Sequence, residues 1–124
     1  MRESERGQSL VEFALTLTIF LLTLMLILDM GRGVYAYAAI SAAAGEGARY
    51  GIVHPGDTAG VIAATRARAR GLEPNRTTIN VAWPDSNHVE VQVLYDFYAV
   101  SPLIDAAFGS TGYLRLSYTA RMRI

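Results

Sequence analysis

Residues 13–28 read FALTLTIFLLTLMLIL, and this run decides the fold because none of its residues carries a charge. Glu12 precedes the run and Asp29 follows it. As an α-helix with a rise of ~1.5 Å per residue, the run would be about 24 Å long, shorter than a hydrocarbon core of about 30 Å. A helix that starts at Gln8 reaches roughly 31 Å and can span the core, provided that Glu12 lies at the membrane edge.

Three interpretations of the apolar run compete. A buried core helix of a soluble protein usually has only about 10–14 apolar residues. A cleaved secretory signal would use Arg2 and Arg6 as its charged start and residues 36–38 (Ala-Tyr-Ala) as its cleavage site, but that site lies about ten residues beyond the run. A retained membrane helix fits both the length and the charges, and we favour it. The arginines before the run favour a cytoplasmic N-terminus and an exported C-terminal part.

Glu12 is an acid at the start of a membrane segment, where charged groups are rare and usually functional. The plain alternative is an interfacial carboxylate that reaches water. Residues 6–13, RGQSLVEF, resemble the processing site of type IV pilin-like precursors. In that family a prepilin peptidase cuts after the glycine, and glutamate is the fifth residue of the mature chain. The resemblance implies cleavage between Gly7 and Gln8. The new amine on Gln8 would be largely protonated at neutral pH and would pair with Glu12, within one chain or between neighbouring subunits, and this pairing could select the register of assembly.

The resemblance extends beyond this start. Residues 7–14 (GQSLVEFA), residues 28–32 (LDMGR) and a later alanine-rich stretch with Gly45, Arg49 and Gly51 are similar to the TadE-like family, pseudopilins of tight-adherence (Tad) pilus systems. The ending at residues 120–123, ARMR, is similar to the family's last strand. The resemblance implies an inner-membrane precursor with one span, an exported head, and a minor subunit of a pilus involved in adhesion. Its implied partners are the peptidase, other pilin or pseudopilin subunits in an oligomer, and the lipid bilayer.

The composition excludes several other functions. The chain has 11 basic and 11 acidic residues, with no Lys and no Cys. A formal charge of zero argues against bulk binding of nucleic acid. The absence of Lys excludes Walker-type phosphate loops and Schiff-base chemistry, and the absence of Cys excludes disulfides and thiolate zinc sites.

The helix should continue past the apolar run to about Ile52, since nothing before Pro55 breaks it. Asp29 and Arg32 stand three residues apart, can pair on one face, and mark the outer membrane boundary. Ala39, Ala43 and Gly47 recur every four residues, a spacing that lets helix backbones approach closely. This ridge predicts either packing beneath the chain's own sheet or a face between subunits. Val34, Tyr35, Ile40 and Tyr50 are our candidates for contacts with the sheet.

The remaining residues predict a small head. A second helix should begin at Asp57 or Thr58 and run to about Arg70, and a short helix should begin at Ser101-Pro102. Alternating apolar residues predict strands over Thr77–Trp83, Val89–Tyr98 and Leu114–Ile124, with the order of the last strand open. Arg66 and Arg70 share a face of the second helix and Arg68 does not, so these cations either complement the helix dipole or bind an anionic surface.

The predicted fold class is therefore α+β. A long pilin-like N-terminal helix, with its first half in the membrane, packs on an antiparallel sheet of about three strands with one or two short helices. We divide the chain into a leader at residues 1–7, a transmembrane and assembly helix at 8–33, and a head at 34–124.

We find no convincing catalytic or metal-binding motif and expect neither an enzyme nor a cofactor. His54, Asp57, Asp85 and His88 have no distinctive metal-ligand spacing. Residues 75–77, Asn-Arg-Thr, fit the glycosylation pattern only weakly. The leading hypothesis is a pseudopilin, and the alternatives are a permanently anchored extracytoplasmic binding module, a main filament subunit, and a small exported enzyme or metal-binding domain.

Overall fold

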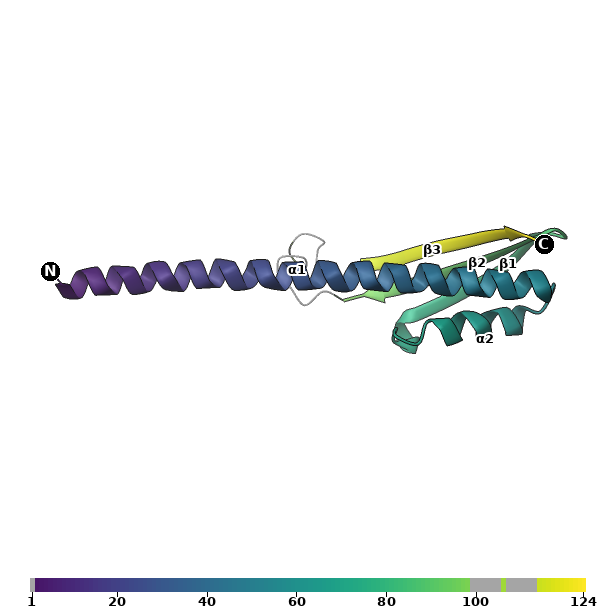
Figure 1. Ribbon diagram of the computed structural model, residues 1–124, viewed down its shortest axis with the longest axis horizontal. Helices are drawn as coiled ribbons and strands as arrows, with labels where there is room; N and C mark the ends of the chain where they lie inside the picture. The colour runs from purple at the N-terminus through teal and green to yellow at the C-terminus, as the bar shows by residue number, and fades with distance from the viewer. Residues whose placement is uncertain (1, 99–105, 107–113) are drawn as a thin grey trace.

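The computed structural model describes residues 2–98, 106 and 114–124, and it combines one very long helix with a small head along its C-terminal half (Figure 1). Helix α1 spans Arg2–Val53 and helix α2 spans Thr58–Arg68. A 3-10 turn, η1, covers Pro74–Arg76. The strands are β1 (Thr77–Asp85), β2 (His88–Phe97) and β3 (Leu114–Arg123). This α+β arrangement confirms the predicted fold class.

Helix α1 starts earlier than predicted, because it includes the expected leader. Glu3 and Glu5 lie in its first turn, where negative charge complements the positive end of the helix dipole. Gly31 and Gly33 do not interrupt the helix, although each disfavours it by about 1 kcal/mol relative to Ala. The two halves of α1 therefore form one unbroken element.

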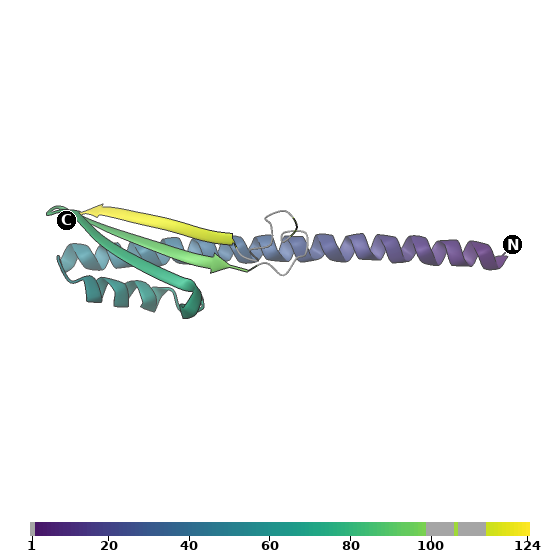
Figure 2. The ribbon, with the colours of Figure 1, turned by 180° about the vertical axis from the view of Figure 1, so that it is seen from behind.

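The sheet is antiparallel with the order β1-β2-β3. Strand β3 joins the free edge of β2, and this result settles the strand order that the sequence left open. The register places Val91 of β2 between Val81 of β1 and Ala120 of β3. Seen from both sides, the sheet and α2 lie along the distal half of α1 (Figures 1 and 2).

The core of the head lies where α1 crosses the sheet. Strand β2 buries every second residue, and α2 contributes Val61 and Thr65. The α1 side is built mainly from small residues, so the sheet can approach the helix axis closely. The buried apolar residues of α1 are Ala36, Ile40, Ala43, Ala44 and Ala48.

Two of the predicted helix contacts with the sheet are wrong. Val34 and Tyr35 expose 69% and 63% of their surface. Both lie away from the buried face of α1, which repeats at intervals of three and four residues through Ala36, Ile40 and Ala43. The prediction favoured large side chains, whereas the buried face of α1 consists mainly of alanine.

The short helix predicted from Ser101-Pro102 to Phe108-Gly109, together with Asp105, lies outside the described residues apart from Ala106, which is helical and exposed.

Candidate membrane and assembly surface

The N-terminal half of α1 is an apolar rod without cover. It contains the one helix window in the described residues that is long and apolar enough to cross a membrane, and none of that window is buried within the chain. Phe13, Phe20 and Ile27 each expose about 60% of their surface. Burial is worth roughly 25 cal/mol per Å² of apolar surface, so this half requires an apolar environment outside its own chain.

Glu12 is exposed on the rod, one helical turn after Gln8. The Gln8 side-chain amide donates to Glu12 Oε1 at 3.4 Å, a long hydrogen bond. Gly7, one residue earlier, has nothing within 4 Å of the position that a Cβ would occupy. The predicted processing bond, Gly7–Gln8, and the predicted acid therefore lie on one exposed helical segment, in adjacent turns of the helix.

Asp29 and Arg32 form the predicted pair, with a guanidinium nitrogen 3.3 Å from Asp29 Oδ1. Their surroundings differ strongly, because the Asp29 side chain is 2% exposed and the Arg32 side chain is 52% exposed. The Arg32 guanidinium also lies 5.4 Å from the centroid of the Phe97 ring, at the end of β2. The sequence spacing indicated the pair, but it carried no signal for the deep burial of Asp29.

The predicted ridge of small residues packs within the chain, and its three members are buried to different degrees. Ala43 and Gly47 are buried within the chain, whereas Ala39 is only partly buried. A Cβ on Gly47 would overlap the Thr65 hydroxyl, and a Cβ on Gly51 would lie 2.9 Å from a Val89 methyl group. These two glycines therefore let α2 and β2 approach α1, and this part of the ridge serves the chain's own packing.

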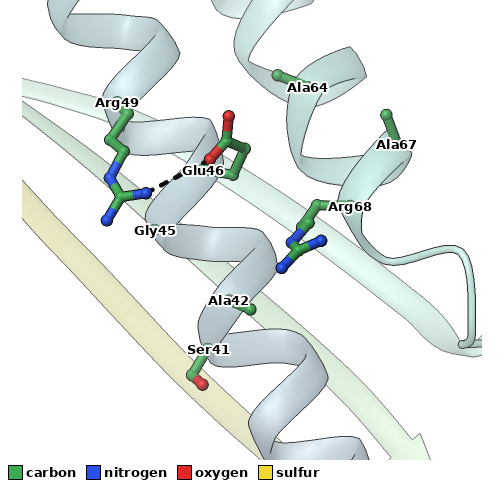
Figure 3. A pocket seen from close by; sticks show the side chains of 8 residues that line it. All are labelled: Ser41, Ala42, Gly45, Glu46, Arg49, Ala64, Ala67 and Arg68. Atoms are coloured by element: carbon green, nitrogen blue, oxygen red, sulfur yellow. Dashed lines mark ion pairs between the residues drawn. The ribbon is translucent and has the colours of Figure 1, made fainter.

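A second strip of small residues on α1 faces an open groove between α1 and α2. Figure 3 shows Arg68 and two alanines on the α2 side, opposite Gly45 and Glu46 on α1. The groove has a volume of about 620 Å³. Arg49 and Glu46 pair across 3.6 Å at its upper end. The complete lining is Ser41, Ala42, Gly45, Glu46, Arg49, Ala64, Ala67 and Arg68.

The turn between α1 and α2 is held by Asp57, which caps α2. Its Oδ1 accepts from the Gly60 backbone N–H at 3.0 Å, and its Oδ2 accepts from the Tyr50 hydroxyl at 3.0 Å. The Gly60 hydrogen bond and then the Tyr50 hydroxyl lower the pKa of Asp57, while the Asp57 carboxylate raises the pKa of Tyr50. The Tyr50 ring stacks on His54 with centroids 4.4 Å apart. Of the two predicted caps, Asp57 is the observed one.

Asp85 and His88 pair in the turn between β1 and β2. His88 Nδ1 lies 2.8 Å from both carboxylate oxygens, and this contact, followed by the Asn87 N–H, lowers the pKa of Asp85. In the turn between α1 and α2, Tyr50 stacks on His54 and donates a hydrogen bond to Asp57. No group of three or more potential metal ligands occurs among residues 2–98, 106 and 114–124.

The arginines of α2 separate as the helical spacing predicted. Arg66 and Arg70 line a cleft of about 260 Å³ beside η1, whereas Arg68 lines the groove on α1. Within the described part of the chain, none of these three arginines forms an ion pair. Arg66 and Arg68 lie in the last turn of α2, where cations are favoured by the helix dipole, and Arg70 lies two residues beyond the end of the helix.

A family model described as TadE-like protein matches residues 7–49, which cover the apolar rod and most of the α1 face beneath the head. No curated protein and no solved structure matches the chain significantly. Over residues 7–49 the chain is therefore similar to the TadE-like family, which is the resemblance that its sequence predicted.

Proposed function

We propose that this chain is a membrane-inserted pseudopilin that a prepilin peptidase cleaves between Gly7 and Gln8 and that then joins a Tad pilus through α1. One observation carries the proposal: the apolar half of α1 has no cover in its own chain, yet it continues without a break into a helix that the head buries. The apolar half of such a helix can leave the lipid and pack against helices of neighbouring subunits, while the head keeps its fold.

The dimensions support a membrane stage. Residues 8–33 would span roughly 39 Å as a helix, which exceeds a hydrocarbon core of about 30 Å and reaches both interfaces. The hydroxyls of Thr16, Thr18 and Thr23 donate to backbone carbonyls one turn earlier, at 2.8 Å each. The three polar groups in the apolar run are therefore satisfied inside the helix, and a bilayer can surround it.

Charge pairing supports the assembly stage. Cleavage after Gly7 would leave a protonated amine on Gln8, whose side chain is already within reach of Glu12. In an apolar environment an unpaired carboxylate costs several kcal/mol. We infer that Glu12 pairs with this amine in its own chain or in a neighbouring subunit, and that the requirement selects the register between subunits.

The role we propose is structural. It requires packing of α1 against pilin or pseudopilin subunits and uses no reaction by the chain itself. The head would stay on the exported side of the cytoplasmic membrane until assembly carries it into an extracellular pilus, where it could contribute to adhesion.

The first test is the N-terminus of the protein purified from membranes of cells that contain the peptidase. Intact-mass spectrometry should show loss of residues 1–7, and cells without the peptidase should retain them. Gly7→Val should block the cut, while Gly31→Ala, at another glycine with no neighbour within 4 Å, should leave it unchanged. An intact N-terminus in peptidase-containing cells would instead indicate a permanently anchored binding module.

A second test separates assembly from processing. Glu12→Ala should be cleaved normally but should be recovered in purified pili at a much lower level than the wild type. Glu12→Gln keeps the size and the hydrogen-bonding atoms and removes only the charge, so it should share the defect. Incorporation of both variants at wild-type levels would refute the role of the charge.

A further inference from the structure

The end of the head that faces the apolar rod carries arginine and tyrosine side chains. Helix α2 and η1 bring the chain back toward the rod, as Figure 1 shows. A Cβ on Gly71 would lie 2.7 Å from the Tyr35 hydroxyl, so the end of the α2 segment touches α1 at Tyr35. Tyr35 is about 4.5 Å above Arg32 and about 9 Å above Asp29 along the helix axis. The base of the head is therefore close to the end of the span.

Two arginines at this base lie against aromatic rings. The Arg32 guanidinium lies 5.4 Å from the Phe97 ring centroid, and the Arg76 guanidinium lies 4.1 Å from the Tyr98 ring centroid. Tyr35 exposes 63% of its surface. Tyrosine is enriched where proteins cross membrane interfaces, and arginine with a stacked, weakly hydrated guanidinium is well suited to bind phosphate.

The charges at the base are unbalanced, although the whole chain has equal numbers of acidic and basic residues. The three described carboxylates there are occupied, because Asp29 pairs with Arg32 at 3.3 Å, Glu73 pairs with Arg76 at 3.1 Å and Asp96 pairs with Arg115 at 2.9 Å. Arg66 and Arg70 add two exposed cations without an ion pair in the described residues, and both line a cleft of about 260 Å³. The excess charge at the base is therefore positive.

We propose that this basal cluster, defined as Arg32, Tyr35, Arg66, Arg70, Arg76 and Tyr98, binds the phosphate groups of anionic phospholipids in the leaflet from which α1 emerges. Before assembly, the cluster would hold the base of the head at the membrane surface, with the tip pointing away from the membrane. The inference rests on the membrane insertion in the proposed function, but it does not depend on peptidase processing or on filament formation.

The chain has no Cys, so a single label can report the height of the head. The full chain would be placed in phosphatidylcholine vesicles with or without about 30% phosphatidylglycerol, an anionic lipid. A fluorophore on Asn75→Cys, within η1, would be quenched by nitroxide-labelled headgroups. A fluorophore on Ser86→Cys, in the turn at the opposite end of the head, serves as the distant reference.

We expect stronger quenching at position 75 in anionic vesicles than in neutral ones, and we expect salt to reduce the difference. The double variant Arg66→Gln with Arg70→Gln should abolish most of this difference in quenching. Each arginine near an anionic surface increases the binding constant roughly fivefold. Arg121→Gln with Arg123→Gln, the same charge change on β3 near the tip, should preserve the difference in quenching. Position 86 should stay unquenched throughout.

Flotation of the same vesicles separates the two proposals. If the chain fails to float with any vesicle, the membrane stage of the proposed function is wrong and the lipid site falls with it. If the chain floats but quenching at position 75 is the same in both lipids, only the lipid site is overturned. Crosslinks between copies that disappear in the Arg66 and Arg70 variant, without a lipid effect, would assign the cluster to a neighbouring subunit and also overturn it.

Discussion

Gly45 and Gly47 lie two residues apart on α1 and have opposite surroundings. A Cβ at Gly45 would meet nothing within 4 Å, whereas a Cβ at Gly47 would overlap the Thr65 hydroxyl. That hydroxyl is buried and donates to the Val61 carbonyl at 2.8 Å, so it cannot move away without losing its bond. The pair therefore offers a matched test of the contact between α1 and α2.

Gly47→Ala should destabilise the head. Overpacking costs about 1–3 kcal/mol, and the gain in helix propensity of about 1 kcal/mol offsets only part of it. The same change at Gly45 should be neutral or stabilising by up to about 1 kcal/mol. Denaturant unfolding in detergent, followed by the fluorescence of Trp83, measures both variants. Equal stability of the two variants would show that α2 does not approach α1 at Gly47.

Acid should weaken the two turns of the head. The pKa values of Asp57 and Asp85 are lowered in the folded chain, so both contribute stability above the ordinary value of 3.8 and lose it as the pH falls through the folded pKa. The denaturant concentration at the unfolding midpoint should change little between neutral pH and about pH 5. It should decrease once the pH is below 3.8. The double variant Asp57→Asn with Asp85→Asn removes both titrating groups and keeps a capping side chain. Its stability should therefore decrease less in acid than that of the wild type. Parallel curves for the two proteins would contradict this account.

At the scale of elements, the apolar rod and the tip of α1 both expose large side chains, but only the rod should matter for insertion. Phe20 lies at the middle of the run and Val53 at the end of the helix, with exposures of 59% and 71%. Phe20→Arg should disfavour integration by roughly 2.5–3.5 kcal/mol, whereas Val53→Arg should have no effect. Carbonate extraction of membranes measures the fraction integrated. Equal extraction of the two variants would argue against residues 13–28 as the span.

The elements themselves could be predicted from the sequence wherever one periodicity dominated. The alternation in Val89–Tyr98 identified β2, and helix signals at Asp57 identified α2. The sequence also indicated the Asp29–Arg32 pair, because its spacing is local. The face of α1 that meets the sheet was misjudged at Val34 and Tyr35, since hydrophobic size is a poor guide on an alanine-rich helix. The burial of Asp29 and the close approach at Gly47 depend on tertiary contacts, which local patterns do not contain.

For the whole molecule, the head depends on a helix that also belongs to the rod. The sheet buries its apolar face against Ile40 and the surrounding alanines of α1, and the head has no disulfide to replace that cover. A head of this size without its helix would have too thin a core. The division of the chain at residue 34 remains a prediction that truncation can test.

A fragment of residues 34–124 should be monomeric, should fold, and should unfold cooperatively. A fragment of residues 54–124 lacks α1 and should show neither a cooperative transition nor the dispersed NMR spectrum of a packed sheet. Circular dichroism and NMR of both fragments test the prediction. Cooperative folding of the shorter fragment would mean that α1 is a passive neighbour of the sheet.

The unbroken course of α1 through Gly31 and Gly33 has a mechanical consequence. A membrane helix commonly tilts by ~20°, and α1 extends about 36 Å beyond Asp29, so such a tilt would swing the tip sideways by roughly 12 Å. With no joint between the two halves, a rotation of the lipid-facing end would turn the head through the same angle. If the apolar half is inserted in the membrane as proposed, its orientation therefore sets the orientation of the sheet at the other end of α1.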